Sequence, residues 1–292
     1  MQERVSFKSD GLDLAGILHI PEDLKKGEKR PAFMVLHGFG TNKDGTTPRQ
    51  AAEILENMGY IVLRFDMRGC GESGGEHAYI LCQDQVRDTQ SAVTFLETVK
   101  QVDAKKIGVL GHSFGGAVAP YAAAVDKRIA ACVSVAGWGD GVSKFREQHK
   151  SPAAWKRFLG KLEQGRRHRQ KTGKSLMVPR FDIVPIPPAM RHLLVGNAIM
   201  EFPAETAMSM MDFRANDVVG LIAPRPYLIL HPADDTVTPT SQALGLFANA
   251  KMPTDMHLVT GVDHFMFHED DGVVRKILEA WLAKNIPVKG KK

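Results

Sequence analysis

The 292-residue chain is 43% apolar and 24% charged, a balance typical of a folded globular protein and unlike that of a disordered one. Its net charge of +5 comes from residues 144–180, where twelve Lys or Arg stand against two Glu, so the rest of the chain is slightly acidic. Because a uniformly basic nucleic-acid-binding protein would not show this uneven distribution of charge, we expect no nucleic-acid partner.

Three cysteines (Cys70, Cys82 and Cys132) are too few and too scattered for a disulfide framework or a zinc site. The first residues do not resemble a signal peptide, and no stretch approaches the roughly 20 apolar residues of a membrane span. We therefore expect a cytoplasmic protein with no membrane partner and no bound metal. The sequence carries no signal of the oligomeric state.

Short apolar runs alternate along the chain with segments of helical period. We expect strands at residues 5–8, 14–20, 32–36, 60–66, 106–110, 129–135, 227–231 and 256–259. We expect helices at about residues 48–58, 83–101, 115–125, 240–250 and 270–285. Strands that are apolar on both faces and alternate with helices predict an α/β fold, in which a parallel sheet is covered on both sides. Ligands of such sheets bind beyond the carboxyl ends of the strands.

The pentapeptide Gly-His-Ser-Phe-Gly at residues 111–115 follows one predicted strand and opens a predicted helix. This context is what a G-x-S-x-G nucleophile elbow requires, so Ser113 is the predicted nucleophile. The alternative is a glycine turn without chemistry. A serine hydroxyl needs a base, and His264, directly after the last strand, is the best placed of eleven histidines. His37 and His112 are expected to shape their loops, and His231 is expected to be structural.

The base needs a carboxylate to orient it, and the loop after the strand at 227–231 offers two, Asp234 and Asp235. The residues alone do not separate them. For the oxyanion hole we expect the main-chain amide of Phe114, the residue after the nucleophile, and that of Phe39 in the glycine-containing loop 37–40. All of these groups lie at the carboxyl ends of predicted strands.

Taken together, these loops resemble those of the α/β-hydrolase superfamily, across essentially the whole chain. The resemblance rests on the loop 37–40, the segment Asp-Met-Arg-Gly-Cys-Gly-Glu-Ser at 66–73, the elbow, the acid loop and His264. Within the superfamily the chain looks most like dienelactone-hydrolase-related and prolyl-peptidase-like esterases. The resemblance implies a mostly parallel eight-stranded sheet whose second strand is antiparallel, and it favours Asp235 as the acid. Pro232 departs from the family pattern, where glycine is frequent.

Residues 138–218 have no place in the predicted sheet, and the resemblance implies that they form a helical lid inserted into a core made of residues 1–137 and 219–292. Trp155, Phe158, Leu159 and Leu162 have helical spacing, which predicts a helix that packs over the site. Residues 178–188 are expected to form a stiff, proline-rich connector without helix. Four methionines could line an acyl pocket, although a helix core is the simpler interpretation: Met200, Met208, Met210 and Met211.

These observations favour hydrolysis of a small or medium carboxylic ester by Ser113, His264 and Asp235, with neither cofactor nor metal required. Alternatives with the same triad are cleavage of a thioester, amide, lactone or carbon–carbon bond, or acyl transfer in secondary metabolism, because the fold does not determine the substrate. A non-catalytic ligand receptor on the same fold is a further alternative. The basic segment is most simply a solvated helix face, and the alternative is a preference for anionic substrates or acyl carriers.

Overall fold

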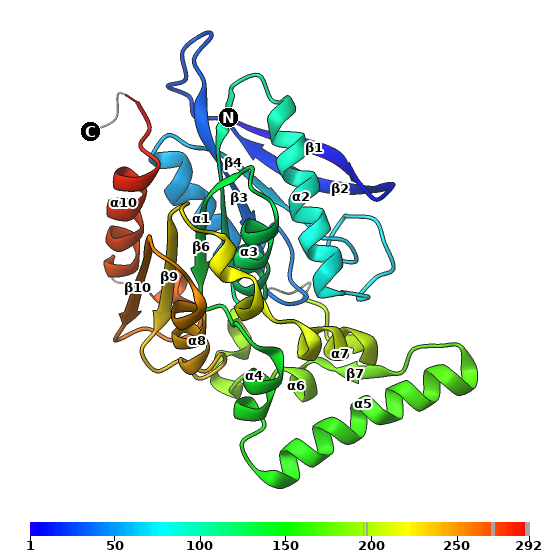
Figure 1. The fold of residues 1–292 in the computed structure, drawn as a ribbon. Helices are drawn as coiled ribbons and strands as arrows, with labels where there is room; N and C mark the ends of the chain where they lie inside the picture. The colour runs from blue at the N-terminus through cyan, green and yellow to red at the C-terminus, as the bar shows by residue number, and fades with distance from the viewer. Residues whose placement is uncertain (195, 197, 270–271, 290–292) are drawn as a thin grey trace.

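A computed structural model describes residues 1–194, 196, 198–269 and 272–289 (Figure 1). Its centre is an eight-stranded sheet in the order β1-β2-β4-β3-β5-β6-β9-β10. The strands are β1 (Gln2–Ser9), β2 (Leu12–His19), β3 (Arg30–Leu36), β4 (Ile61–Phe65), β5 (Val102–His112), β6 (Ile129–Val135), β9 (Tyr227–Pro232) and β10 (Thr254–Val259). β2 is antiparallel to both of its neighbours and the other pairs are parallel, which confirms the expected topology.

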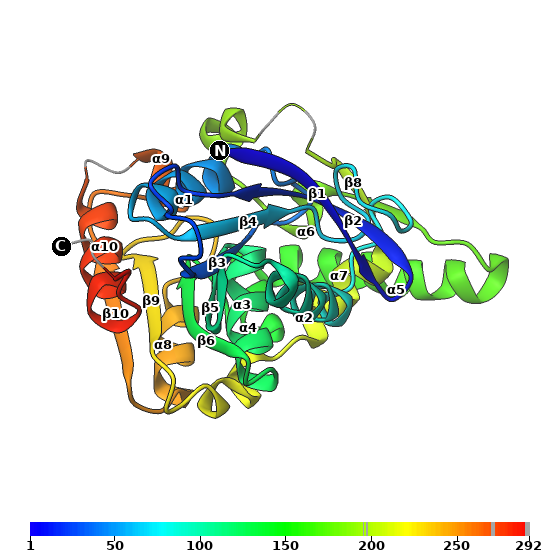
Figure 2. The same cartoon turned by 90° about the horizontal axis from the view of Figure 1, so that it is seen from above.

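Helices cover both faces of the sheet, as the two-sided apolar strands predict (Figure 2). One face packs against α1 (Thr46–Asn57), α9 (Met266–Glu269) and α10 (Val273–Asn285). The other packs against α2 (Cys82–Thr98), α3 (Phe114–Val125) and α8 (Ser241–Asn249). Cys132, on β6, is fully buried between β5 and β9.

Between β6 and β9, which pair directly, the chain forms a group of helices beside the carboxyl edge of the sheet. We call residues 138–218 the insert. Its elements are α4 (Gly141–Gln148), α5 (Pro152–Thr172), β7 (Met177–Pro179), α6 (Arg180–Ile183), η1 (Pro188–Leu193), β8 (Glu201–Pro203), α7 (Ala204–Asp212) and η2 (Ala215–Asp217), and η3 (Val219–Leu221) follows it. β7 pairs with β8 outside the main sheet.

Two expectations about the insert are wrong. The stretch 178–188 is not a helix-free connector, because one helical turn, α6, fits between Pro179 and the later prolines. Helix α5 does not pack over the site: it packs against α7 and extends past the body of the molecule (Figure 1). Only Phe158, Leu162 and Gly165 of its 21 residues are buried. Within the described ranges, no helix combines the length and apolarity of a membrane span.

Lys144, on α4, is a buried cation. It is 2% exposed, and its Nζ donates to Gln148 Oε1 over 3.0 Å and lies 4.0 Å from the centre of the Phe145 ring. Among the described residues no carboxylate forms an ion pair with it. Burial lowers the pKa of Lys144 from 10.5 to about 7. Because the unfolded chain holds this proton up to a higher pH than the folded protein does, the stability contributed here rises with pH between about 7 and 10.5.

We therefore expect Lys144→Met to raise the free energy of unfolding by about 1–3 kcal/mol at pH 7. The gain should shrink as the pH approaches 10, where the lysine is neutral in both states. Urea titrations at pH 7 and pH 10 measure both values. Lys156→Met, at an exposed position of α5, should leave the free energy of unfolding unchanged at both pH values. A gain equal at both pH values would show that the effect comes from packing alone.

Candidate active site

Ser113 occupies a sharp turn between β5, which ends at His112, and α3, which begins at Phe114. Its backbone has φ 57° and ψ −114°, a strained conformation for a residue with a side chain. The glycines on either side are required by space. A Cβ at Gly111 would overlap the main chain of Gly115, and a Cβ at Gly115 would lie 2.6 Å from the carbonyl oxygen of Leu36. The G-x-S-x-G pattern thus reflects close approach of three backbone segments.

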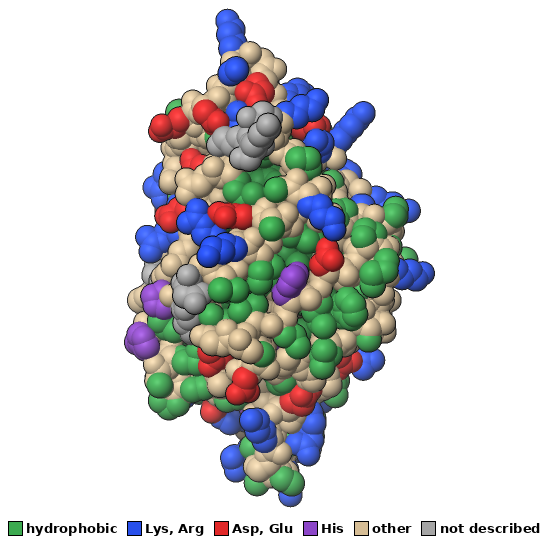
Figure 3. All heavy atoms as spheres, turned by 90° about the vertical axis from the view of Figure 1, so that its left-hand side faces the viewer, with side chains coloured by type: hydrophobic (Ala, Val, Ile, Leu, Met, Phe, Trp, Pro, Cys, Tyr) green, Lys and Arg blue, Asp and Glu red, His purple; other side chains and the backbone are tan. Residues whose placement is uncertain are grey.

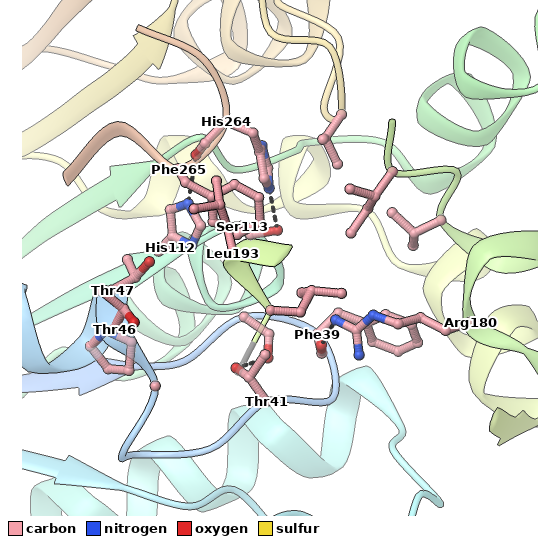
Figure 4. Close-up of a pocket in the computed structure, with 17 residues that line it drawn as sticks. Phe39, Thr41, Thr46, Thr47, His112, Ser113, Arg180, Leu193, His264 and Phe265 are labelled. Carbon is pink, nitrogen blue, oxygen red and sulfur yellow. Dashed lines mark hydrogen bonds between the residues drawn. The ribbon is translucent and has the colours of Figure 1, made fainter. Parts of the chain in front are cut away.

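The three side chains predicted as nucleophile, base and acid lie in one hydrogen-bonded row. Figure 4 shows its Ser113–His264 part. His264 Nε2 is 2.9 Å from Ser113 Oγ, and His264 Nδ1 is 2.9 Å from Asp235 Oδ2. Since a carboxylate accepts, Nδ1 carries the proton and Nε2 is left to accept from the serine hydroxyl. This is the geometry that general-base activation of a serine requires.

The structure separates the two candidate acids. Asp234 is exposed, whereas Asp235 is 9% exposed and its Oδ1 accepts from the amides of Val237 and Thr238 at 2.8 and 2.7 Å. Burial alone would raise the pKa of Asp235, but the nearby His264 and these hydrogen bonds outweigh it and the pKa is lowered. Asp235 therefore stays ionised at neutral pH and faces His264.

Further contacts hold the base and acid loops together. Asp263 accepts from the amide of His264 at 2.7 Å and from the amide of Thr236 at 2.8 Å, so it bridges the two loops. Burial lowers the pKa of His112 to about 3, and this neutral ring donates from Nε2 to the carbonyl of His264 at 2.8 Å. The base is thus held at its main chain as well as at its ring.

His37 and His231 have the structural roles expected from the sequence. His37 Nε2 accepts from the amide of Met67 at 3.1 Å, and its Nδ1 donates to the carbonyl of Gly38 at 2.9 Å. His231 is fully buried and donates from Nε2 to the carbonyl of Thr238 at 3.0 Å. Both therefore shape loops.

Two main-chain amides beside Ser113 are available to an oxyanion. Phe114 begins α3, so its amide has no intrahelical acceptor. Phe39 lies in the loop after β3, and a Cβ on the preceding Gly38 would be 3.7 Å from Ser113 Cβ, so this loop approaches the serine closely. In the described part of the chain neither amide donates to a protein acceptor. The arrangement can therefore bind a negative oxygen next to Ser113.

Ser113 opens into a cavity of about 50 Å³. The insert supplies its outer wall, from Arg180, Val184, Ile186, Leu193 and Leu194. None of these five was predicted, because nothing in their local pattern distinguishes them from other residues of the segment.

The simpler interpretation of the methionines holds for the helix: Met210 is buried in the core, and Met208 and Met211 pack against it. Met200 is 48% exposed, and among the described residues no methionine lines the cavity, so the acyl-pocket interpretation is wrong. No group of three or more His, Cys, Asp or Glu side chains among the described residues could hold a metal ion.

Comparison with known proteins identifies the relatives of this chain. A model of the "Alpha/beta hydrolase family" matches residues 33–276. "Thiohydrolase aneE" of Aspergillus aculeatus is 30% identical over 274 residues, which are 87% of this chain and 83% of that protein. "Polyketide transferase grgF" of a Penicillium species is 26% identical over 283 residues, 92% of each chain. The crystal structure of the alpha/beta hydrolase GrgF from Penicillium sp. sh18 superposes with a TM-score of 0.82 at 25% identity, over 98% of this chain and 99% of that one.

The contrast between the two adjacent carboxylates provides a direct test of the triad. Asp235→Asn should lower kcat by about 10⁴-fold, because the amide favours the wrong tautomer of His264. Asp234→Asn removes the same charge from the exposed neighbour and should leave kcat within about twofold. Steady-state kinetics on an activated acyl substrate measures both. Equal losses in the two variants would contradict the assignment of Asp235.

Proposed function

Because this chain belongs to the alpha/beta hydrolase family, we propose that it is a serine hydrolase that cleaves an acyl thioester through an acyl-enzyme on Ser113. The observation that carries the proposal is the hydrogen-bonded row Ser113–His264–Asp235 beside two free amides. The names of the relatives, a thiohydrolase and a polyketide transferase, favour a thioester over the simple carboxylic ester expected first.

The geometry supports the following steps. Ser113 Oγ attacks the thioester carbonyl carbon while its proton passes to His264 Nε2, and the new oxyanion accepts from the amides of Phe39 and Phe114. The carbon–sulfur bond then breaks, and the thiolate leaves with the proton of His264. Water gives a proton to His264 and attacks the acyl-enzyme, after which Ser113 regains a proton and the acid departs. Asp235 stabilises the imidazolium that forms in each half of the reaction.

Acyl transfer is the second candidate, and the cavity favours it. The walls near Ser113 include Val184, Ile186, Leu193 and Leu194, so the acyl-enzyme would form in a small and largely apolar space. Such a site restricts water and lets a bound hydroxyl, amine or carbon acceptor compete for the acyl group. The polyketide-transferase relatives support this possibility.

The central experiment compares thioesters with oxygen esters that carry the same acyl group. We expect kcat/KM to be higher for the N-acetylcysteamine thioester. Ser113→Ala should lower kcat by about 10⁴–10⁶-fold without changing the thermal midpoint. A higher kcat/KM for the oxygen ester would remove the thioester assignment. Failure of a fluorophosphonate to label Ser113 would remove the hydrolase assignment altogether and favour a ligand receptor.

Added acceptors separate hydrolysis from transfer. With a thioester substrate and rising alcohol or amine, a transferase should form the acylated acceptor at the expense of free acid. Product analysis by mass spectrometry measures the ratio. Free acid as the sole product at every acceptor concentration would leave hydrolysis as the activity.

The basic helix α5 bears on the choice of acyl donor. Its cations are mostly exposed, although Arg166 and Arg167 both pair with Glu163, and no residue of α5 lines the cavity. Any preference for an anionic donor must therefore act over a distance and be screened by salt. We expect kcat/KM for a coenzyme A thioester, relative to its N-acetylcysteamine counterpart, to fall as ionic strength rises. A ratio that does not change with ionic strength would show that the cations of α5 have no influence on the choice of acyl donor.

A further inference from the structure

Arg180 is the first residue of α6 and lines the cavity with Ser113. It is 3% exposed, yet among the described residues no carboxylate pairs with it. The other buried arginines all have such partners: Arg30 with Asp23 and Glu28, Arg64 with Asp44, and Arg68 with Asp10 and Asp88. Burial lowers the pKa of Arg180 to about 10, which leaves it charged at neutral pH. Burying a guanidinium without a carboxylate partner is costly, so the burial of Arg180 calls for a compensating role.

The guanidinium binds main-chain oxygens in place of a carboxylate. Its Nη2 donates to the carbonyl of Phe39, and its Nη1 lies 3.4 Å from the carbonyl of Gly40 and 2.8 Å from that of Ile199. Its planar group also lies 5.4 Å from the ring of Phe39 and 5.9 Å from that of Phe202. Two of the three acceptors thus belong to the loop that carries the predicted oxyanion donor.

Two other residues of the insert, Ile199 and Phe202, also contact the loop at Phe39 and Gly40. The ring of Phe202 stacks on that of Phe39 with centres 4.1 Å apart, and the amide of Ile199 donates to the carbonyl of Gly40 at 2.8 Å. Gly40 has φ +53°, and a Cβ there would overlap the Phe202 ring and lie 3.0 Å from Arg180 Nη1. The contact is therefore close enough to demand glycine.

These contacts restrict the direction in which the Phe39 N–H can point. The carbonyl of Gly38, in the same planar peptide as that amide, accepts from His37 Nδ1 at 2.9 Å and Thr41 Oγ1 at 3.0 Å. Because the peptide is planar and trans, holding that carbonyl directs the Phe39 N–H the opposite way. Arg180 holds the next peptide plane. With both planes held, the amide has little freedom to turn away from the developing charge.

We propose that Arg180 is a positioning residue of the reaction, which the insert supplies to fix the Phe39 amide in the oxyanion hole. This inference rests on the proposed acyl-enzyme chemistry at Ser113, but it does not depend on whether the leaving group is a thiol or an alcohol. It makes the insert part of the catalytic architecture, in addition to being a wall of the cavity. A guanidinium is suited to the task because its fork reaches several carbonyls at once, whereas an ammonium is a single point of charge.

The test compares Arg180→Met with Arg225→Met. Arg225 also donates to main-chain carbonyls, those of Leu221, Ile222, Asp126 and Ile129, but near the amino ends of β6 and β9, away from the site. The two substitutions therefore remove the same kind of bonds from different places. The measurements are kcat, KM, the thermal midpoint, and the affinity for a trifluoromethyl ketone, which adds to the serine to form a tetrahedral oxyanion.

For Arg180→Met we expect kcat to fall by about 10–10²-fold, less than the roughly 10²–10³-fold loss of a whole oxyanion donor because His37 and Thr41 still hold the Gly38 carbonyl, with KM within about threefold of the wild type. The affinity for the trifluoromethyl ketone should fall by a similar factor, since a transition-state analogue uses the same donors. Arg225→Met should leave kcat and the affinity for the trifluoromethyl ketone unchanged, even if it lowers the thermal midpoint as much as Arg180→Met does. Arg180→Lys should stay closer to Arg180→Met than to the wild type.

A loss of thermal midpoint in Arg180→Met with unchanged kcat and analogue affinity would overturn the proposal, because the role would then be structural. Recovery of wild-type kcat by Arg180→Lys would also overturn it, because charge alone would suffice. Should Arg180→Met fail to fold, Phe202→Leu removes the ring that stacks on Phe39 in the same loop. We again expect equal losses of kcat and of affinity for the analogue. A change in KM alone would contradict the proposal. Since the analogue has no leaving group, its binding tests Arg180 even where the thioester assignment fails.

Discussion

The backbone of Ser113 is the constraint on which the rest of this molecule depends. A residue with a side chain is held at φ 57° between a buried strand and a buried helix, and three main-chain segments meet there so closely that glycine is required on both sides. The turn carries the serine hydroxyl to the carboxyl edge of the sheet, and it leaves the first amide of α3 without an acceptor among the residues that the structure describes. Every other group of the site reaches this point from a loop at the same edge.

The loops around the serine are interlocked, which limits how far any one of them can drift. Asp263 joins the base loop to the acid loop, and the ring of His112, next to the serine in sequence, holds the main chain of His264. The acid itself is fixed by the amides of Val237 and Thr238. A reaction that depends on sub-ångström alignment benefits from such cross-bracing, because little reorganisation is needed when charge develops.

The core of the fold and the grouping of the site residues could be predicted from sequence because both depend on local patterns. Two-sided apolar strands indicate a covered sheet, and the elbow is a short motif in a fixed context. The choice between Asp234 and Asp235 needed either a family resemblance or the three-dimensional structure, since both residues precede the same turn. The insert was less predictable: the spacing of Phe158 and Leu162 indicates that one face of α5 is buried, but not that its partner is α7. Arg180 could not be singled out from the sequence for a related reason. A count of charges treats it as one of twelve cations in residues 144–180, although it is the one of these twelve that lines the cavity with Ser113.

The two kinds of contact that the insert makes with the site have different consequences for how the enzyme can change. Arg180 and Phe202 contact the loop at Phe39 through a hydrogen bond and ring stacking, so under the proposal above we expect substitutions of these two side chains to lower the rate. Ile199 is bonded to the same loop through its main-chain amide. Val184, Ile186, Leu193 and Leu194 touch the cavity mainly through apolar side chains. Laboratory evolution of new acyl specificity is therefore best confined to these four positions, where volume can be redistributed while the machinery around Ser113 stays intact.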